Sequence, residues 1–316
     1  MNRVAEIIDL KWAHSRQITG KNVGVAVLDT GVWMHPDFVN ETGRIIGFKD
    51  ILQDRKQMYD DNGHGTHVCG ILGGNGVASK GKYIGVAPEC NLIVVKVLNQ
   101  KGNGNISDVI QGLKWVLDNR KKYNIRILNI SVGTPAKKEL EESSELVQAV
   151  NEVWDAGIIV VVAAGNNGPF PQTIGAPGNS RKVITVGASD DDLLVEMDGS
   201  KIKDYSSRGP TKECIIKPDI VAPGSNVVSC NGIKVSKNNM YSIKSGTSMA
   251  TPAVSGAIAL LLSVYPHMTG RDVKVRLKNS AVDCGFPMNQ QGWGCLNIRR
   301  LLRLEEDNQR GCRFNE

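Results

Sequence analysis

The sequence Ser-Gly-Thr-Ser-Met-Ala-Thr-Pro, residues 245–252, leads directly into an uncharged apolar run at residues 253–264. The run predicts a helix that is apolar nearly all round, and such a helix lies buried inside a protein. At roughly twelve residues the run is too short to span a bilayer, which takes about 20 residues. We therefore expect a central core helix, around which the rest of the chain folds.

Ser248 stands where this helix is expected to begin. The first N–H groups of a helix are unpaired, and the helix dipole is positive at that end. Negative charge that develops there is stabilised, as acyl transfer by a serine requires. Taken alone, however, Ser248 is more simply explained as a helix cap.

Several continuous apolar runs predict strands that are buried on both faces. They lie at residues 23–28, 92–98, 125–132, 158–164 and 183–186, and helix-period segments at 108–123 and 139–156 separate some of them. Buried strands that alternate with helices predict an α/β fold with a central, mostly parallel sheet and helices on both faces. In such a fold the functional groups are expected at the carboxyl ends of the strands.

Length and composition predict one globular domain over residues 1–304 and a polar tail over 305–316. The chain has 316 residues, 22% of them charged, and a net charge of +6. Because the basic residues are scattered, we expect no nucleic-acid partner. We also expect no membrane partner, and the composition leaves the oligomeric state open.

The N-terminal residues and the cysteines favour a cytoplasmic location. Residues 1–6 lack the apolar block of a secretory signal. The seven cysteines show no C-x-x-C pair and no zinc-site spacing, which favours reduced thiols. A secreted mature form is the alternative.

Three further polar residues complement Ser248. Asp29 ends the first apolar run, and a buried carboxylate needs a hydrogen-bonding or charged partner. His64 stands between two glycines that allow close approach of the backbone, and Asn166 follows the strand expected at 158–164. Taken alone, Asp29 could cap a turn and Asn166 could be a turn residue. His67 could pair with His64 as a metal ligand, but no third ligand is evident, so we expect a packed or hydrogen-bonding helix residue.

Together these residues form the set that serine acyl transfer requires, in the chain order Asp…His…Ser. The motifs around them resemble those of the subtilisin-like serine peptidases, or subtilases, and the match extends over residues 20 to 300. They are Val-Leu-Asp-Thr-Gly at 27–31, Asn-Gly-His-Gly-Thr-His at 62–67, Ala-Ala-Gly-Asn at 163–166 and Gly-Thr-Ser-Met-Ala-Thr-Pro at 246–252. The pattern is most similar to that of the intracellular subtilases of Gram-positive bacteria.

The resemblance implies a three-layer subtilisin-like fold and a serine endopeptidase. Ser248 would be the nucleophile, His64 the general base and acid, and Asp29 the residue that orients His64. The amide of Asn166 and the N–H of Ser248 would hold the oxyanion. Two alternative functions stay open. One is a pseudoprotease that binds peptides without cleaving them, and the other is a peptidase dedicated to processing one precursor.

The resemblance also implies where a peptide or protein substrate binds. Two segments, Gly102-Asn103-Gly104 and Ser131-Val132-Gly133, would sandwich it as an added strand. The primary specificity pocket would be formed by Ala163, Ala164, Gly165 and Gly175. Because these residues are small and none is acidic, we expect large apolar side chains, rather than Lys or Arg, before the cut.

Two departures from the family pattern bear on metals and thiols. The loop at residues 73–82, where secreted subtilisins bind calcium tightly, has two lysines and no carboxylate. We therefore expect that site to be absent; weaker structural calcium sites stay possible, and no cofactor is expected to act in catalysis. Cys69 replaces a usual alanine and is expected to be a small buried hydrophobic residue.

Overall fold

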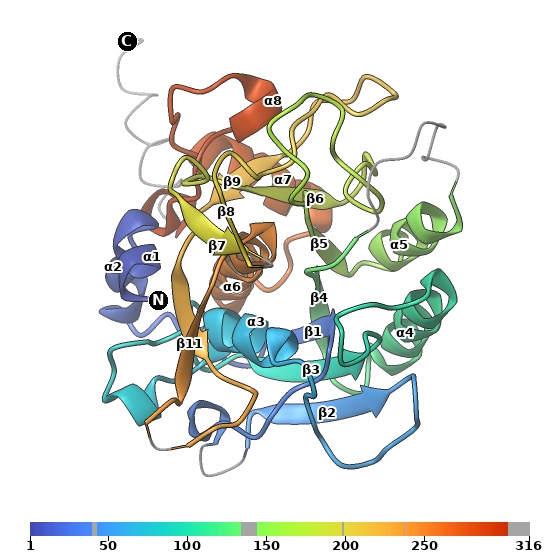
Figure 1. Ribbon diagram of the computed structural model, residues 1–316, viewed down its shortest axis with the longest axis vertical. Helices are drawn as coiled ribbons and strands as arrows, with labels where there is room; N and C mark the ends of the chain where they lie inside the picture. Colours follow the sequence, from blue (N-terminus) through green and yellow to red (C-terminus); the bar gives the residue numbers. More distant parts are fainter. Residues whose placement is uncertain (40–42, 134–143, 198, 237, 303–316) are drawn as a thin grey trace.

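The computed structural model describes residues 1–39, 43–133, 144–197, 199–236 and 238–302. Its centre is a seven-stranded sheet in the order β2-β3-β1-β4-β5-β6-β9, in which all neighbouring strands are parallel (Figure 1). The strands are β1 (Gly24–Asp29), β2 (Ile45–Asp50), β3 (Asn91–Lys96), β4 (Ile125–Ile130), β5 (Ile159–Ala163), β6 (Ile184–Ala188) and β9 (Ile220–Ala222). The parallel sheet confirms the predicted class.

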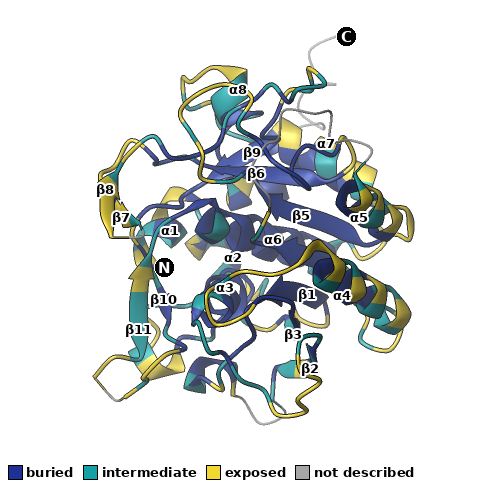
Figure 2. Cartoon of the chain, turned by 45° about the vertical axis from the view of Figure 1, so that its right-hand side comes forward, coloured by how far each residue is buried: buried dark blue, intermediate teal, exposed yellow. Residues whose placement is uncertain are grey.

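Helices cover both faces of this sheet. On one face lie α3 (His64–Gly73), α6 (Thr247–Val264) and α7 (Gly270–Ser280), and on the other lie α4 (Ile106–Asn119) and α5 (Glu145–Asp155). Strand β1 shows how one strand serves both layers: Val25 and Val27 pack in the first core cluster, whereas Ala26 and Leu28 pack in the second. The inner strands of the sheet and most of the central helix α6 are accordingly buried (Figure 2), and the predicted three-layer fold is confirmed.

Helix α6 differs in length from the prediction. It begins at Thr247 and has 18 residues, so Ser248 lies in its first turn. Within the described part of the chain it is the one helix long and apolar enough to cross a membrane. The prediction that it is too short to span a bilayer was therefore wrong. Since 83% of its residues are buried inside the protein, packing in the core accounts for its apolar composition.

The remaining elements are short and lie at the edges of the core. They are α1 (Asn2–Ile7), α2 (Lys11–His14), α8 (Met288–Gln291), two 3-10 turns (Pro36–Phe38 and Val77–Ser79), and two antiparallel pairs, β7 (Val195–Met197) with β8 (Ser200–Ile202) and β10 (Val227–Cys230) with β11 (Tyr241–Lys244). Part of one predicted helix, residues 139–143, lies outside the described residues, as do the boundary expected at 304 and the tail expected at 305–316. The six cysteines in the described ranges are all free thiols, and Cys69 is fully buried.

Candidate active site

The topology places the candidate site at the carboxyl end of β1. This strand lies between β3 and β4, with α3 covering one face of the sheet and α4 the other. The connections that contain α3 and α4 therefore run over opposite faces of the sheet, and this leaves a crevice at the carboxyl end of β1. Ligands of open α/β sheets usually bind in such a crevice. Asp29 is the last residue of β1.

Asp29 and His64 are in direct contact. The Asp29 carboxylate is fully buried, and its Oδ1 lies 2.7 Å from Nδ1 of His64 and accepts a 2.7 Å hydrogen bond from the N–H of Thr30. Its second oxygen, Oδ2, is buried without a partner among the described residues. Gly65 makes the contact possible, because a Cβ at that position would lie 2.2 Å from the carbonyl oxygen of Gly31.

The pKa of His64 is set by two opposed effects. Burial lowers it, because a charged imidazolium is poorly solvated inside the protein, while the charge and hydrogen bond of Asp29 raise it. The effect of Asp29 is the stronger, so the pKa lies above its ordinary value of 6.5. The ring is 23% exposed, which leaves its other edge open to the cleft.

Asp60 fixes the start of helix α3, and the sequence analysis missed it. Its carboxylate accepts hydrogen bonds from the backbone N–H groups of Gly63 (2.7 Å) and Thr66 (2.9 Å) and from the hydroxyl groups of Thr66 (2.6 Å) and Thr30 (2.9 Å). The hydroxyl of Thr30 accepts in turn from the N–H of Gly65. Asp60 therefore joins the helix that carries His64 to the residue next to Asp29. An acidic residue just before a glycine-rich helix start was the available signal.

Replacing Asp60 with alanine should therefore lower the stability and loosen the contact between His64 and Asp29. Several buried donors would lose their acceptor, so we expect a loss of about 2–4 kcal/mol in the free energy of unfolding. Urea titration of a catalytically inactive background would measure it without self-digestion. Asp54→Ala is the control, because that exposed carboxylate has only surface ion pairs with Lys49 and Lys56. Equal stability of the two variants would contradict the role of Asp60.

Ser248 is tied to the end of β4. Its Oγ donates a 2.8 Å hydrogen bond to the carbonyl oxygen of Ser131, and the hydroxyl of Ser131 donates back to the carbonyl oxygen of Ser248 at 3.2 Å. That carbonyl is available because the fourth residue on, Pro252, has no N–H to bond it. Among the described residues no hydrogen bond joins Ser248 to His64, yet both side chains line the same cleft.

Asn166 lies directly beside the first turn of α6. Its Oδ1 accepts hydrogen bonds from the N–H and the hydroxyl of Thr247, both at 3.0 Å. These bonds hold the Asn166 side chain against the first turn of α6 and leave its NH₂ group to donate elsewhere. A Cβ on Gly246 would lie 3.2 Å from that NH₂ nitrogen, so this glycine leaves room for the amide.

The other predicted site residues line two adjoining hollows. The cleft that contains His64, Asn166 and Ser248 has a volume of about 520 Å³. Its walls include the expected substrate-binding residues Gly102, Ser131, Val132, Gly133, Ala163, Ala164, Gly165 and Gly175. Asn103 and Gly104 instead line a neighbouring pocket of about 290 Å³, which is largely apolar and includes Leu98, Ile106, Val109, Ile130, Leu146 and Pro177. This apolar pocket was not predicted from the sequence.

His67 is a structural residue of α3. It is fully buried, and its Nε2 contacts the carbonyl oxygens of Val227 (3.1 Å) and Ser242 (3.2 Å), which tie the helix to β10 and β11. Burial, followed by the charges of Lys244 and His64, lowers its pKa to about 3, so the ring stays neutral. The expectation of a packed, hydrogen-bonding residue is confirmed.

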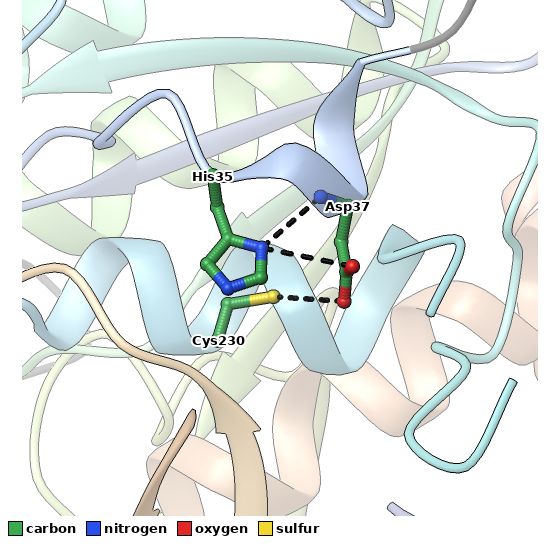
Figure 3. Close-up of side chains that lie close together, drawn as sticks. All are labelled: His35, Asp37 and Cys230. Carbon is green, nitrogen blue, oxygen red and sulfur yellow. Dashed lines mark hydrogen bonds and ion pairs between the residues drawn. The ribbon is translucent and has the colours of Figure 1, made fainter. Parts of the chain in front are cut away.

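A set of three potential metal ligands lies apart from the cleft: His35, Asp37 and Cys230 (Figure 3). It is the one such set within the described ranges, and all three residues are buried. Their polar atoms already have protein partners. Asp37 accepts from the N–H of Ala78, the hydroxyl of Tyr241 and the thiol of Cys230, while Nδ1 of His35 accepts from the N–H of Asp37 and Nε2 lies 2.8 Å from the carbonyl oxygen of Met240. We therefore interpret the cluster as a satisfied hydrogen-bond network.

The same contacts bear on the calcium site of secreted subtilisins. A calcium ion needs six to eight oxygen ligands. The loop at 73–82 instead turns backbone N–H groups toward Asp37, from Asn75 and Ala78. The carbonyl and carboxylate oxygens of Asp37 are thus already bonded to this loop, and the absence of a tight calcium site stays a prediction.

The fold and this grouping of side chains are those of a class of protein, the serine hydrolases. The particular family follows from comparison. Residues 20–294 match the sequence model of the subtilase family, and the chain belongs to that family.

Individual relatives agree with this assignment. The serine protease AprX of Bacillus subtilis is 46% identical over 279 residues, which are 84% of this chain but 62% of AprX. Subtilisin Savinase of Lederbergia lenta is 35% identical over 92% of this chain and 94% of its own length. The structure of sphericase superposes with a TM-score of 0.72 at 32% identity, covering 89% of this chain and 92% of sphericase. The Clostridium perfringens CspB protease has a TM-score of 0.83 over 98% of both chains, and at 20% identity it supports the fold alone.

Proposed function

We propose that the chain is a serine endopeptidase that hydrolyses extended polypeptide through Ser248, His64 and Asp29. The observation that carries the proposal is the 2.7 Å contact between Asp29 and Nδ1 of His64, at the edge of a cleft that Ser248 and Asn166 also line. The family supports it, since AprX and Savinase are both named as proteases or subtilisins.

In the proposed reaction, Nδ1–H of His64 donates to Asp29, which leaves Nε2 free to accept a proton. Ser248 rotates away from the carbonyl of Ser131 and attacks the scissile carbonyl carbon, while its proton passes to Nε2. The NH₂ of Asn166 and the N–H of Ser248 hold the resulting oxyanion. The imidazolium then gives the proton to the leaving amine, and water hydrolyses the acyl-enzyme by the same steps. No metal takes part in these steps.

A fluorophosphonate probe tests this proposal directly. The folded protein should gain one adduct at Ser248, located by peptide mass spectrometry, and should lose peptidase activity in step with labelling. The Ser248→Ala variant and heat-unfolded protein should gain none. An intact, folded protein that neither labels nor cleaves peptides would instead support a pseudoprotease.

The cleft also favours large apolar side chains before the cut. Its small residues Ala163, Ala164, Gly165 and Gly175 leave space, and the described residues that line it include two lysines and no carboxylate. A substrate Lys or Arg would therefore lack a counter-ion. The neighbouring apolar pocket can hold a second apolar side chain farther from the cut.

We accordingly expect cleavage of a denatured proteome mainly after Phe, Tyr, Leu and Met. Peptides with Phe or Leu before the cut should exceed matched Lys peptides in kcat/KM by at least about tenfold, since an uncompensated buried charge costs more than this factor. Cleavage at a single precursor alone would favour the dedicated processing role, and dominant cleavage after Lys or Arg would contradict this interpretation of the cleft.

A further inference from the structure

Lys244 is a charged residue that lines the same cleft as His64 and Ser248 but takes no part in the proposed reaction. It is the last residue of β11, four residues before Ser248. Its side chain lines the cleft and also a second hollow of about 690 Å³, on the other side of His64 and Ser248. Within the described part of the chain, its ammonium group takes part in no hydrogen bond or ion pair.

The position of Lys244 is fixed by the structure around it. It pairs with Val227 in the β10–β11 ladder, and the hydroxyl of the next residue, Ser245, accepts from the N–H of Asn226. His67 links this ladder to α3, the helix that begins with His64. The lysine is thus held beside the imidazole, and its charge reaches the ring: it opposes the effects of Asp29 and Asp60 on the pKa of His64.

The second hollow lies where the part of the substrate after the scissile bond would bind. In the proposed function, the part of the substrate before the cut lies along residues 102–104 and 131–133, and those residues line only the cleft and the apolar pocket. The second hollow shares His64, Asn166 and Ser248 with the cleft but none of those segments. It therefore receives the residues after the cut.

We propose that Lys244 is a specificity-determining residue, which selects polypeptides with an acidic side chain directly after the scissile bond. An unpaired ammonium group beside the reacting carbonyl attracts a substrate carboxylate and repels a substrate Lys or Arg. Glu196, on β7, also lines the second hollow, but it does not line the cleft and is not among the groups with the largest effects on the pKa of His64. Lys244 therefore governs the position nearest the cut. This inference rests on the proposed function.

The test uses quenched fluorescent peptides with Leu before the cut and Glu, Gln or Lys after it. For the unaltered protein at low salt, kcat/KM for the Glu peptide should exceed that for the Lys peptide by about tenfold. This factor combines the attraction of the substrate Glu to Lys244 with the repulsion of the substrate Lys, each of the size usual for exposed charge pairs. The ratio should fall as salt is added. Lys244→Gln should bring it near one, and Lys244→Glu should invert it.

Two control variants separate this role from general changes in charge. Lys101→Gln removes a charge that lines the cleft but not the second hollow, and Glu196→Gln removes one from the second hollow alone. Both should keep the preference for Glu. Lys244→Gln should also move the acid limb of the pH–rate profile to higher pH, because a charge that lowers the pKa of His64 is lost while Asp29 and Asp60 remain. If Lys244 were merely structural, Lys244→Gln would change neither the ratio of kcat/KM between the Glu and Lys peptides nor the pH of the acid limb.

The outcomes also distinguish this inference from the proposed function. Cleavage of all three peptides at equal rates, or a ratio that survives in Lys244→Gln, would overturn the inference and leave the peptidase intact. If no peptide is cleaved, the proposed function fails, and the dissociation constants of the same peptides then decide. Tighter binding of the Glu peptide that is lost in Lys244→Gln would support the role of Lys244, and equal binding would overturn it.

Discussion

Replacing Ser248 with alanine should lower kcat for peptide hydrolysis by about a million-fold, the size of the loss when subtilisin loses its nucleophile. In the proposed mechanism the acyl group is carried by the Ser248 hydroxyl alone, so its removal leaves no route to an acyl-enzyme. KM should change little, since the side chain contributes little to ground-state binding. Progress curves at high enzyme concentration, with mass analysis of the products, would measure the residual rate.

A second serine on the same helix provides the matched control. The hydroxyl of Ser255 is fully buried and donates a 2.9 Å hydrogen bond to Oδ1 of Asn129. Ser255→Ala leaves that oxygen short of a donor and should cost about 1–3 kcal/mol of stability, while peptidase activity of the folded protein stays close to normal. Full activity in Ser248→Ala would end the proposed mechanism.

Apart from the buried Asp29, the residues predicted for the site line one cleft and its neighbouring pocket, whereas two strands of the sheet were not predicted from the sequence. Asp29, His64 and Asn166 each follow or precede a buried apolar segment, and parallel strands bring such positions to one edge of the sheet. Strand β9 was missed because it has three residues enclosed by Pro218 and Pro223, which interrupt the apolar run. Strand β2 was missed because it is an edge strand with mostly half-exposed residues.

Contacts between distant segments could not be predicted from local pattern. Asp60 and Thr30 meet only because α3 approaches the end of β1, and nothing in either segment alone specifies that distance. From the sequence alone Lys244 is indistinguishable from an ordinary surface lysine. The pairing of β10 with β11 places it close enough to affect His64, which lies 180 positions earlier in the chain. The length of α6 was underestimated because the polar residues of its first turn, including Ser248, precede the apolar run from which the length was counted.

Replacing Asp29 with asparagine should have the second-largest effect, a loss of about ten-thousand-fold in kcat. An asparagine can turn its NH₂ group toward Nδ1, which then holds the imidazole in the tautomer that carries its proton on Nε2, where the base must be free.

The pH dependence of Asp29→Asn gives an independent check. Burial lowers the pKa of His64, and Asp29 more than offsets this, so the pKa lies above 6.5. Because the base must be neutral, kcat/KM of the unaltered protein should rise as the pH increases through that value. Without the carboxylate the effect of burial remains, so the acid limb of the residual activity should move to lower pH. Asp54→Asn, which alters an exposed carboxylate, should leave both rate and limb unchanged.

Stability should change with pH in the same sense. From pH 6.5 up to the higher pKa of folded His64, the folded state binds more protons than the unfolded state, so the stability from the ion pair falls as the pH rises. This contribution is fully present below pH 6.5 and is absent in Asp29→Asn. Urea midpoints measured from pH 5 to 9, in the inactive Ser248→Ala background, should therefore differ more between the two proteins at the acid end. If Asp29→Asn changed neither the pH of the acid limb nor the pH dependence of stability, the carboxylate of Asp29 would not act on His64.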